Sequence, residues 1–563
     1  MRSYCSTWRI VLPTLLLAAL SASAAPQLEV RLGFAERFVP GTLTPICVKI
    51  AGVDTFTGFL VLTQKAGNPW RGEAISRVEI PLTLAGGGKL ERLIPIYDFT
   101  HPLAVSLLDQ GEKVLAEVKI DLRSRMREEA FPLAVGVLPF PFADGLVAVD
   151  EEALPRLWPA YEAVSSLWVG HTAKGLPEDS WEAIGRWVSA GGTLILFTGG
   201  DFYLLDSPVL RALLPLANPR LSLGENGVQI LRGEKRPNVR TLLSREGDPL
   251  LLLRRYGAGA VYLVTTSAFN LEETDFKAIA AQITPARLID LTYASADLLE
   301  RTPLQRPAYL AAFLLVLACL VSYSLVVLRA KSKKRMLVLL LATSSILCLS
   351  SGFYTNRTKV VNSIYELKTS LYAQTSFGYV VDYYGLFATM DGTAEVKVRG
   401  QIPIIQELPR SLQQHSFDID WVEGEGASLV LQRGERRYLR GFGAYQLPLA
   451  VVFTGDEEVR IENDLDEPLE EALLIVKGQA FSIGEVRPGE ALYYLNNGVP
   501  LADAEMRKES FTSLFREFAE RFCLADAVWL VGVTEEEVRE RYGTVRIKVR
   551  DIALYVVAGE EHE

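Results

Sequence analysis

The stretch "RWVSAGGTLILFTGGDF", residues 186–202, places two glycine pairs on either side of a short apolar segment. Pro177 lies near the start of the preceding amphipathic segment, and Glu178 follows it at the positive end of the expected helix dipole. Gly191 comes directly after the last helical position, where positive φ costs glycine little. The pattern predicts a helix, a tight turn and a buried strand.

The same alternation extends over a longer region. Strand-like segments "PLAVGVLPF", "SSLWVG" and "TLILFT" alternate with helical patterns, one of which carries Leu154, Trp158 and Tyr161 on one face. Alternation of strand and helix is typical of a parallel sheet with crossover helices. We therefore predict a flavodoxin-like three-layer α/β domain over residues 129–300. Within it, "GDPLLLLRRYGAGAVYLVTT" predicts two paired strands that turn at residues 257–259.

These residues also carry a resemblance. The run from Leu176 through "WVSAGGTLILFTGGDF", with the later "YGAGAVYLVTTSAFN", resembles the class I glutamine-amidotransferase-like domain of uncharacterised bacterial membrane proteins. The segment "IENDLDEPLEEALLIVKGQAFSIGEVRPGE" is similar to one that such proteins carry beyond their membrane spans. The resemblance implies a flavodoxin-like domain outside the cytoplasm.

The resemblance does not extend to the catalytic residues. Catalytic members have a cysteine nucleophile after the strand, where this chain has Thr198, Gly199 and Gly200, followed by Asp201. A glutaminase needs a thiolate and an imidazole, but no cysteine lies between residues 47 and 319 and no histidine follows His171 in the domain. We therefore predict a catalytically degenerate domain without enzymatic activity or cofactor.

The turn after the strand has two interpretations. Backbone N–H groups of Thr198, Gly199, Gly200 and Asp201 could bind an anion at the end of a parallel strand. The alternative, which we favour, is that the glycines only permit a tight turn. The four histidines lie far apart and the chain has no H-E-x-x-H motif, while "NDLDEP" (residues 463–468) lacks EF-hand spacing, so no metal site is predicted.

The flanking regions are patterned as strands. Residues 26–128 show short strands at regular spacing and predict a β-sandwich. Residues 354–563 predict a β-rich extracytoplasmic domain with one helix near 505–523, where phenylalanines at helical spacing indicate core packing. Cys47 and Cys523 are the only cysteines in these exported regions, so they form a possible disulfide whose geometry the sequence does not establish.

Two features predict membrane insertion. Residues 1–25 have the pattern of a signal peptide, and residues 307–328 and 336–353 are each long and apolar enough for a transmembrane helix. The loop at 329–335 is expected to stay in the cytoplasm. Its topology determinants are Arg329, Lys331, Lys333, Lys334 and Arg335. The predicted location is the bacterial inner membrane, with the N- and C-terminal domains outside the cytoplasm.

Composition narrows the function. A net charge of −10 and a pI near 5.3 argue against nucleic-acid binding. We predict a non-enzymatic scaffold, sensor or accessory subunit of a membrane complex, associated by analogy with a transporter or MoxR-type system, whose partners are other membrane or envelope proteins. One alternative is a polysaccharide-binding or polysaccharide-synthesis accessory protein, in which Trp70 would contact sugars. A second is a divergent hydrolase built on Thr198, Asp201 and His171.

Overall fold

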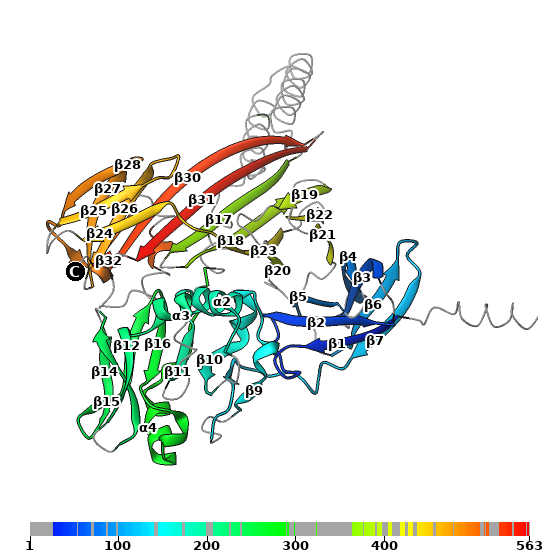
Figure 1. Cartoon of the computed structure of the whole chain (residues 1–563). Coiled ribbons are helices and arrows are strands. Elements are labelled where there is room, and N and C mark those ends of the chain that lie inside the picture. Colours follow the sequence, from blue (N-terminus) through cyan, green and yellow to red (C-terminus); the bar gives the residue numbers. More distant parts are fainter. Residues whose placement is uncertain are drawn as a thin grey trace, which may run out of the picture.

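The computed structural model describes residues 26–291 and 363–561 with gaps, together with Leu298 and Tyr323. The gaps are 53–54, 69–71, 86–87, 97–99, 140–144, 172–174, 199–206, 225–226, 237–238, 289, 375–376, 389–390, 397–403, 408–416, 423–425, 432–435, 454–457, 477, 507–511, 513, 517–527, 543–544 and 559. Strands dominate the described chain, which forms an N-terminal β part, a central α/β part and a C-terminal β part (Figure 1).

The N-terminal part consists of two antiparallel sheets around one core. The first sheet contains β1 (Gln27–Leu32), β2 (Leu43–Ala51) and β5 (Lys89–Pro95). The second contains β3 (Thr55–Asn68), β4 (Gly72–Ala85), β6 (Leu103–Asp109) and β7 (Val114–Ile120). Alternate residues point inward, so that Leu32, Ile46, Leu60 and Val105 are fully buried between the sheets.

The central part is built on a mixed seven-stranded sheet in the order β14-β15-β16-β11-β10-β8-β9. Five strands are parallel: β8 (Phe131–Val135), β9 (Val147–Val149), β10 (Val164–Val169), β11 (Thr193–Phe197) and β16 (Gly259–Val264). β15 (Asp248–Tyr256) pairs antiparallel with β16, and β14 (Val239–Arg245) pairs antiparallel with β15. A separate hairpin pairs β12 (Leu216–Leu223) with β13 (Gln229–Lys235). The helical elements are the 3-10 helices η1 (Glu151–Ala153), η2 (Trp158–Ala163) and η4 (Ala268–Asn270), with α2 (Glu178–Ser189), α3 (Pro208–Leu213) and α4 (Glu273–Gln282).

The glycines of the opening stretch permit close packing at the end of α2. Gly191 N–H donates to Val188 O and Gly192 N–H donates to Trp187 O, the two bonds of a Schellman cap. Gly191 has φ of +118°, and a Cβ there would lie 2.3 Å from Arg287 O. The prediction that this pair ends the helix and begins the strand is confirmed. The sequence predicts a turn at residues 257–259, and the structure places it at residues 257–258, since Gly259 already pairs with Tyr256.

The C-terminal part contains a nine-stranded sheet in the order β20-β23-β18-β17-β31-β30-β26-β27-β29. Its strands are β17 (Ser363–Gln374), β18 (Gly378–Ala388), β20 (Ile404–Glu407), β23 (Arg436–Ala444), β26 (Leu469–Val476), β27 (Gln479–Val486), β29 (Val499–Pro500), β30 (Trp529–Tyr542) and β31 (Val545–Ala558). A four-stranded sheet packs nearby: β28 (Gly489–Tyr494), β25 (Glu458–Asn463), β24 (Leu449–Phe453) and β32 (Glu560–Glu561). A short 3-10 helix, η5 (Leu501–Asp503), follows β29.

Three strands from the C-terminal region of the sequence belong to the second sheet of the N-terminal part. These are β19 (Gly392–Val396), β21 (Phe417–Val422) and β22 (Gly426–Leu431), and β21 pairs in parallel with β4 through Phe417 and Ser76. One continuous sheet therefore contains strands from both the N-terminal and the C-terminal regions of the sequence.

The predicted fold class is wrong for the molecule. Strands, not alternating helices and strands, make up most of it, and the central sheet departs from a flavodoxin-like three-layer domain. Residues 158–163 form a 3-10 helix in place of a full crossover helix, and β14 and β15 add antiparallel strands at one edge. The local alternation is present, but long-range antiparallel pairing determines the architecture.

The membrane prediction is also corrected. No helix in the described part of the chain combines the length and apolar composition needed to cross a bilayer. We therefore do not retain the predicted transmembrane helical hairpin. The membrane as a partner of two spans and the inner-membrane location are not retained either. The segments behind that prediction, residues 1–25, 307–328 and 336–353, and the basic residues 329–335, lie outside the described residues except for Tyr323.

A buried carboxylate joins the three parts. Glu162 in η2 accepts hydrogen bonds from Leu43 N–H in β2, at 3.3 Å, and from Arg440 Nη2 in β23, at 3.0 Å. The Glu162 and Arg440 side chains are only 8% and 10% exposed. Arg440 also lies over the ring of Phe442, whose centroid is 4.6 Å away, and Trp158 packs edge-on against that ring. One core contains residues from all three parts.

The pair predicts a non-additive response to substitution. Arg440→Met leaves the Glu162 carboxyl buried without its cation and should lower stability by about 3 kcal/mol. Adding Glu162→Leu removes the stranded charge, so the double variant should be more stable than Arg440→Met alone. Urea-unfolding midpoints measure both. Arg487→Met is the control, because its pair with Glu485 is largely exposed and is worth less than about 1 kcal/mol. Losses that simply add would contradict this account.

The pair also predicts a pH dependence. Burial raises the pKa of Glu162 above 4.5, and attraction to Arg440 opposes the rise. A carboxyl with a raised pKa binds its proton more tightly in the folded chain, so its contribution is present below pH 4.5 and is lost as pH rises through the folded pKa. The melting temperature of the wild type should therefore fall relative to that of Glu162→Gln across this window. A relative rise would show that Arg440 outweighs burial.

Candidate functional site

The carboxyl ends of the parallel strands gather the polar residues that the sequence singled out. His171 follows β10, Thr198 follows β11, and Thr265 and Thr266 follow β16. Ligands of open α/β sheets bind outside this edge, which makes it the candidate site of the central part. We call it the carboxyl edge.

Thr198 connects two neighbouring strands by hydrogen bonds. Its side chain is 1% exposed, and Oγ1 donates to Val264 O at 3.2 Å. Its backbone N–H donates to the same carbonyl at 3.4 Å. The hydroxyl therefore ties β11 to the last residue of β16, as a structural threonine does. Gly199, Gly200 and Asp201, the rest of the predicted anion-binding turn, lie outside the described residues.

His171 lies at the same edge in a different setting. It forms an antiparallel bridge with Val137, in which Val137 N–H donates to His171 O at 2.7 Å. Its exposed ring meets the edge of Phe269 at a centroid separation of 6.4 Å. Val137 and Phe269 are 56% and 54% exposed. His171 therefore contacts two exposed apolar residues, Val137 through its backbone and Phe269 through its ring, while the Thr198 hydroxyl is directed to Val264.

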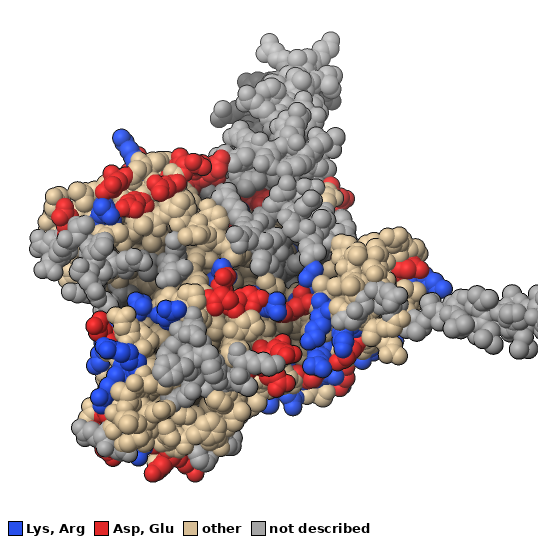
Figure 2. Space-filling model, in the orientation of Figure 1, with Lys and Arg blue, Asp and Glu red and all other residues tan. Residues whose placement is uncertain are grey.

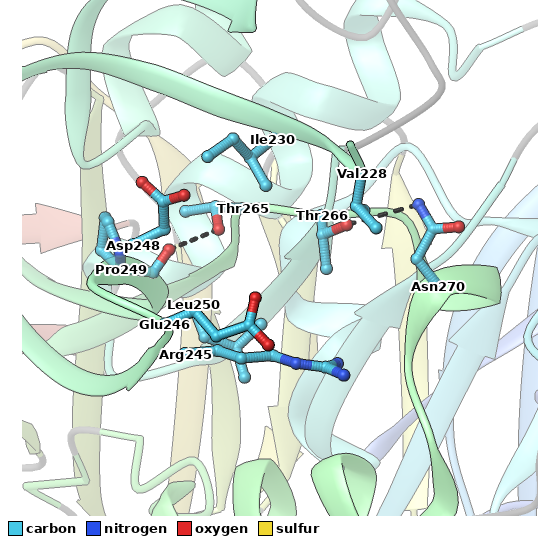
Figure 3. A pocket seen from close by; sticks show the side chains of 10 residues that line it. All are labelled: Val228, Ile230, Arg245, Glu246, Asp248, Pro249, Leu250, Thr265, Thr266 and Asn270. Atoms are coloured by element: carbon cyan, nitrogen blue, oxygen red, sulfur yellow. Dashed lines mark hydrogen bonds between the residues drawn. The ribbon is translucent and has the colours of Figure 1, made fainter. Parts of the chain in front are cut away.

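A small pocket opens beside β16 (Figure 3). It is lined by Val228, Ile230, Arg245, Glu246, Asp248, Pro249, Leu250, Thr265, Thr266 and Asn270. Its volume of about 30 Å³ admits little more than water, whereas pockets for small-molecule ligands occupy about 300 Å³ or more. Figure 3 shows Thr265 and Thr266 bound within the wall: Thr265 Oγ1 donates to Pro249 O at 2.6 Å, and Asn270 Nδ2 donates to Thr266 Oγ1 at 3.5 Å.

Two arginines near the pocket are paired with carboxylates. Arg232 Nη2 lies 2.6 Å from Asp248 Oδ1. Arg245 Nη1 lies 3.1 Å from Asp275 Oδ2, and that carboxylate also caps α4 by accepting Glu272 N–H. The tight turn between β14 and β15, where Glu246 and the following glycine both have positive φ, places Arg245 opposite Asp248 beside the pocket. Sequence reasoning missed this pocket, although Glu246-Gly247 between two apolar runs is a hairpin signal.

Metal-binding potential is limited in the part of the chain that is described. No three His, Cys, Asp or Glu side chains there lie close enough to hold an ion. In the "NDLDEP" segment, Asn463 is fully buried and stabilises a turn: Oδ1 accepts Leu465 N–H at 3.1 Å, and Nδ2 donates to Val486 O at 3.0 Å. These two hydrogen bonds give Asn463 a structural role in this turn.

The remaining candidates fall in several places. Cys47 is half-buried in β2 and has no disulfide partner among the described residues, and burial raises the pKa of its thiol. Its predicted partner Cys523 lies outside the described residues, so the disulfide stays a prediction. Trp158, Trp181 and Trp187 are buried. Trp70 lies outside the described residues. Of the predicted aromatic stripe, Phe515 is described and fully buried.

The role of Thr198 is testable by two substitutions. Thr198→Val removes the hydroxyl that donates to Val264 O and should lower the unfolding free energy by about 1 kcal/mol. Thr198→Ser keeps the donor and should stay closer to the wild type. Urea denaturation of the purified variants measures the difference. A valine variant as stable as the wild type would mean that the hydroxyl has no structural role.

Comparison with known proteins adds little. No protein-family model and no curated protein matches the chain. Among solved structures, a Paenibacillus sp. cycloisomaltooligosaccharide glucanotransferase shares 14% identity over 31% of this chain and 28% of its own, with a TM-score of 0.16. An M1 zinc metallopeptidase from Deinococcus radiodurans shares 12% identity over 34% of this chain and 47% of its own, with a TM-score of 0.12. The matched regions span less than half of either structure, and such scores carry no argument about fold or function.

Proposed function

We propose that this chain is a non-enzymatic scaffold or accessory protein that binds a protein partner at its carboxyl edge. The observation that carries the proposal is the exposure of two apolar neighbours of His171: Val137, which pairs with it through the backbone, and Phe269, whose ring contacts its ring. Exposed apolar side chains that lie together mark interaction sites more often than isolated ones do. Aromatic residues are also enriched in protein interfaces.

The chemistry of the edge favours binding over turnover. The hydroxyls of Thr198, Thr265 and Thr266 donate to the backbone carbonyls of Val264, Pro249 and Gln229. A nucleophile needs a base within hydrogen-bond reach, and these hydroxyls are instead directed to carbonyl oxygens. The pocket volume of about 30 Å³ also favours a partner that contacts the surface over a substrate that enters it.

The junction between the three parts supports a scaffold. Glu162 fixes the α/β part to β2 on one side and to β23 on the other. A shared core that includes Leu43, Trp187 and Phe442 reinforces the arrangement. Charged side chains of both signs lie close together along this boundary (Figure 2). A protein whose parts are fixed in this way presents its surfaces in constant geometry.

The proposal predicts a partner that depends on the carboxyl edge. Crosslinking in intact cells, followed by purification and mass spectrometry, should recover one protein at near-equal molar amount with the wild-type chain. Val137→Asp combined with Phe269→Asp introduces charge at the centre of the surface and should reduce its recovery at least about tenfold, as expected for interface anchors.

Leu223→Asp is the matched control, because Leu223 is 67% exposed in the same part of the molecule but lies in β12. It should leave recovery unchanged. Equal recovery with the edge variant, or loss with the control alone, would contradict binding at this edge. Turnover of an amide or ester by the purified chain that Thr198→Val abolishes would contradict the non-enzymatic role.

A further inference from the structure

The outer edge of the four-stranded C-terminal sheet carries a second exposed surface. β28 stands at the end of the order β28-β25-β24-β32, so within the described chain no strand pairs with its outer side. Figure 1 shows it on the side of the C-terminal part away from the α/β part. Leu492 and Tyr494 are 54% and 68% exposed on this strand. Open edge strands offer unpaired backbone donors and acceptors to another chain.

The side chains of β28 alternate between two environments. Ala491 and Tyr493 are half-buried and lie opposite Ile461 and Val459 of β25, which are fully buried. Glu490, Leu492 and Tyr494 point to the exposed face. A strand added to this edge must keep the same inner and outer faces, because a slip by one residue would turn every side chain over.

We propose that β28 pairs antiparallel with β28 of a second copy, joining two four-stranded sheets into one across a two-fold axis. Keeping inner faces together requires the axis to pass through a residue. An axis at Ala491 would pair residues 489–493 and one at Leu492 would pair residues 490–494, and only the axis at Leu492 includes both exposed apolar side chains, Leu492 and Tyr494. This register sets Leu492 against Leu492 and Glu490 against Tyr494 on the outer face. Opposite residues in such a pair are the units of sheet stabilisation.

The sequence is complementary to itself in this register. A carboxylate meets a phenol hydroxyl at both ends of the outer row, so no like charges are opposed. On the inner face the small Ala491 lies opposite the large Tyr493, which avoids crowding near the core. Arg460 of the neighbouring strand lies 3.5 Å from Glu490. A closed two-fold contact of this kind forms a dimer without further growth.

Charge exchange at Leu492 tests the pairing directly. Leu492→Glu and Leu492→Lys each place like charges face to face across the axis, so each purified full-length variant should be monomeric in analytical ultracentrifugation at concentrations where the wild type is a dimer. Mixing the two variants should restore a dimer, because opposite charges then face each other. The wild-type dimer should dissociate on dilution, since one strand pair buries less than a standard interface.

Val114→Glu and Val114→Lys are the controls, because Val114 is 52% exposed on β7 in the N-terminal part. They should leave the wild-type dimer intact. Circular dichroism and melting temperature confirm that all variants fold. A wild-type chain that stays monomeric at about 0.1 mM would overturn the proposal. So would a dimer that survives both single substitutions, or a mixture that stays monomeric.

Discussion

The Glu162 carboxylate is the point on which the arrangement of the molecule depends. It accepts a backbone N–H from the N-terminal part and the guanidinium of Arg440 from the C-terminal part, while it belongs to the central part itself. Burial disfavours the ionised form of this carboxyl more than the attraction of Arg440 favours it, since the pKa of Glu162 is raised. The pair therefore contributes geometry more than net stability. The apolar core around Trp158 and Phe442 supplies the favourable free energy.

This junction has consequences at the carboxyl edge. The central sheet is fixed between two β parts, and further contacts such as Leu291 N–H to Tyr383 Oη, at 2.9 Å, tie its following segment to β18. Val137 and His171 follow β8 and β10, and Phe269 lies in η4 after β16, so all three lie next to this sheet. The polar residues Thr198, Thr265 and Thr266 at this edge are engaged in contacts with strand carbonyls, which supports the proposal that the edge binds a partner.

Local features were predictable from the sequence and long-range ones were not. Pro177 and Gly191 mark the ends of α2 because backbone geometry at a helix terminus depends on a few neighbouring residues. The pairing of β21 with β4 joins residues more than 300 positions apart in sequence, for which no local pattern exists. The Arg232–Asp248 pair likewise depends on how two hairpins meet. The membrane prediction relied on apolar runs, and such a run predicts burial without specifying what covers it.

The central claim is that the three parts form one arrangement, and distance measurements test it most directly. Spin labels introduced with non-canonical amino acids at Leu223, in the α/β part, and Val499, in the C-terminal part, occupy exposed positions on β12 and β29. Double electron–electron resonance should give a single narrow distance distribution for the wild type, and a broader one when Arg440→Met is added. A broad or multiple distribution in the wild type would mean that the buried pair does not fix these parts together.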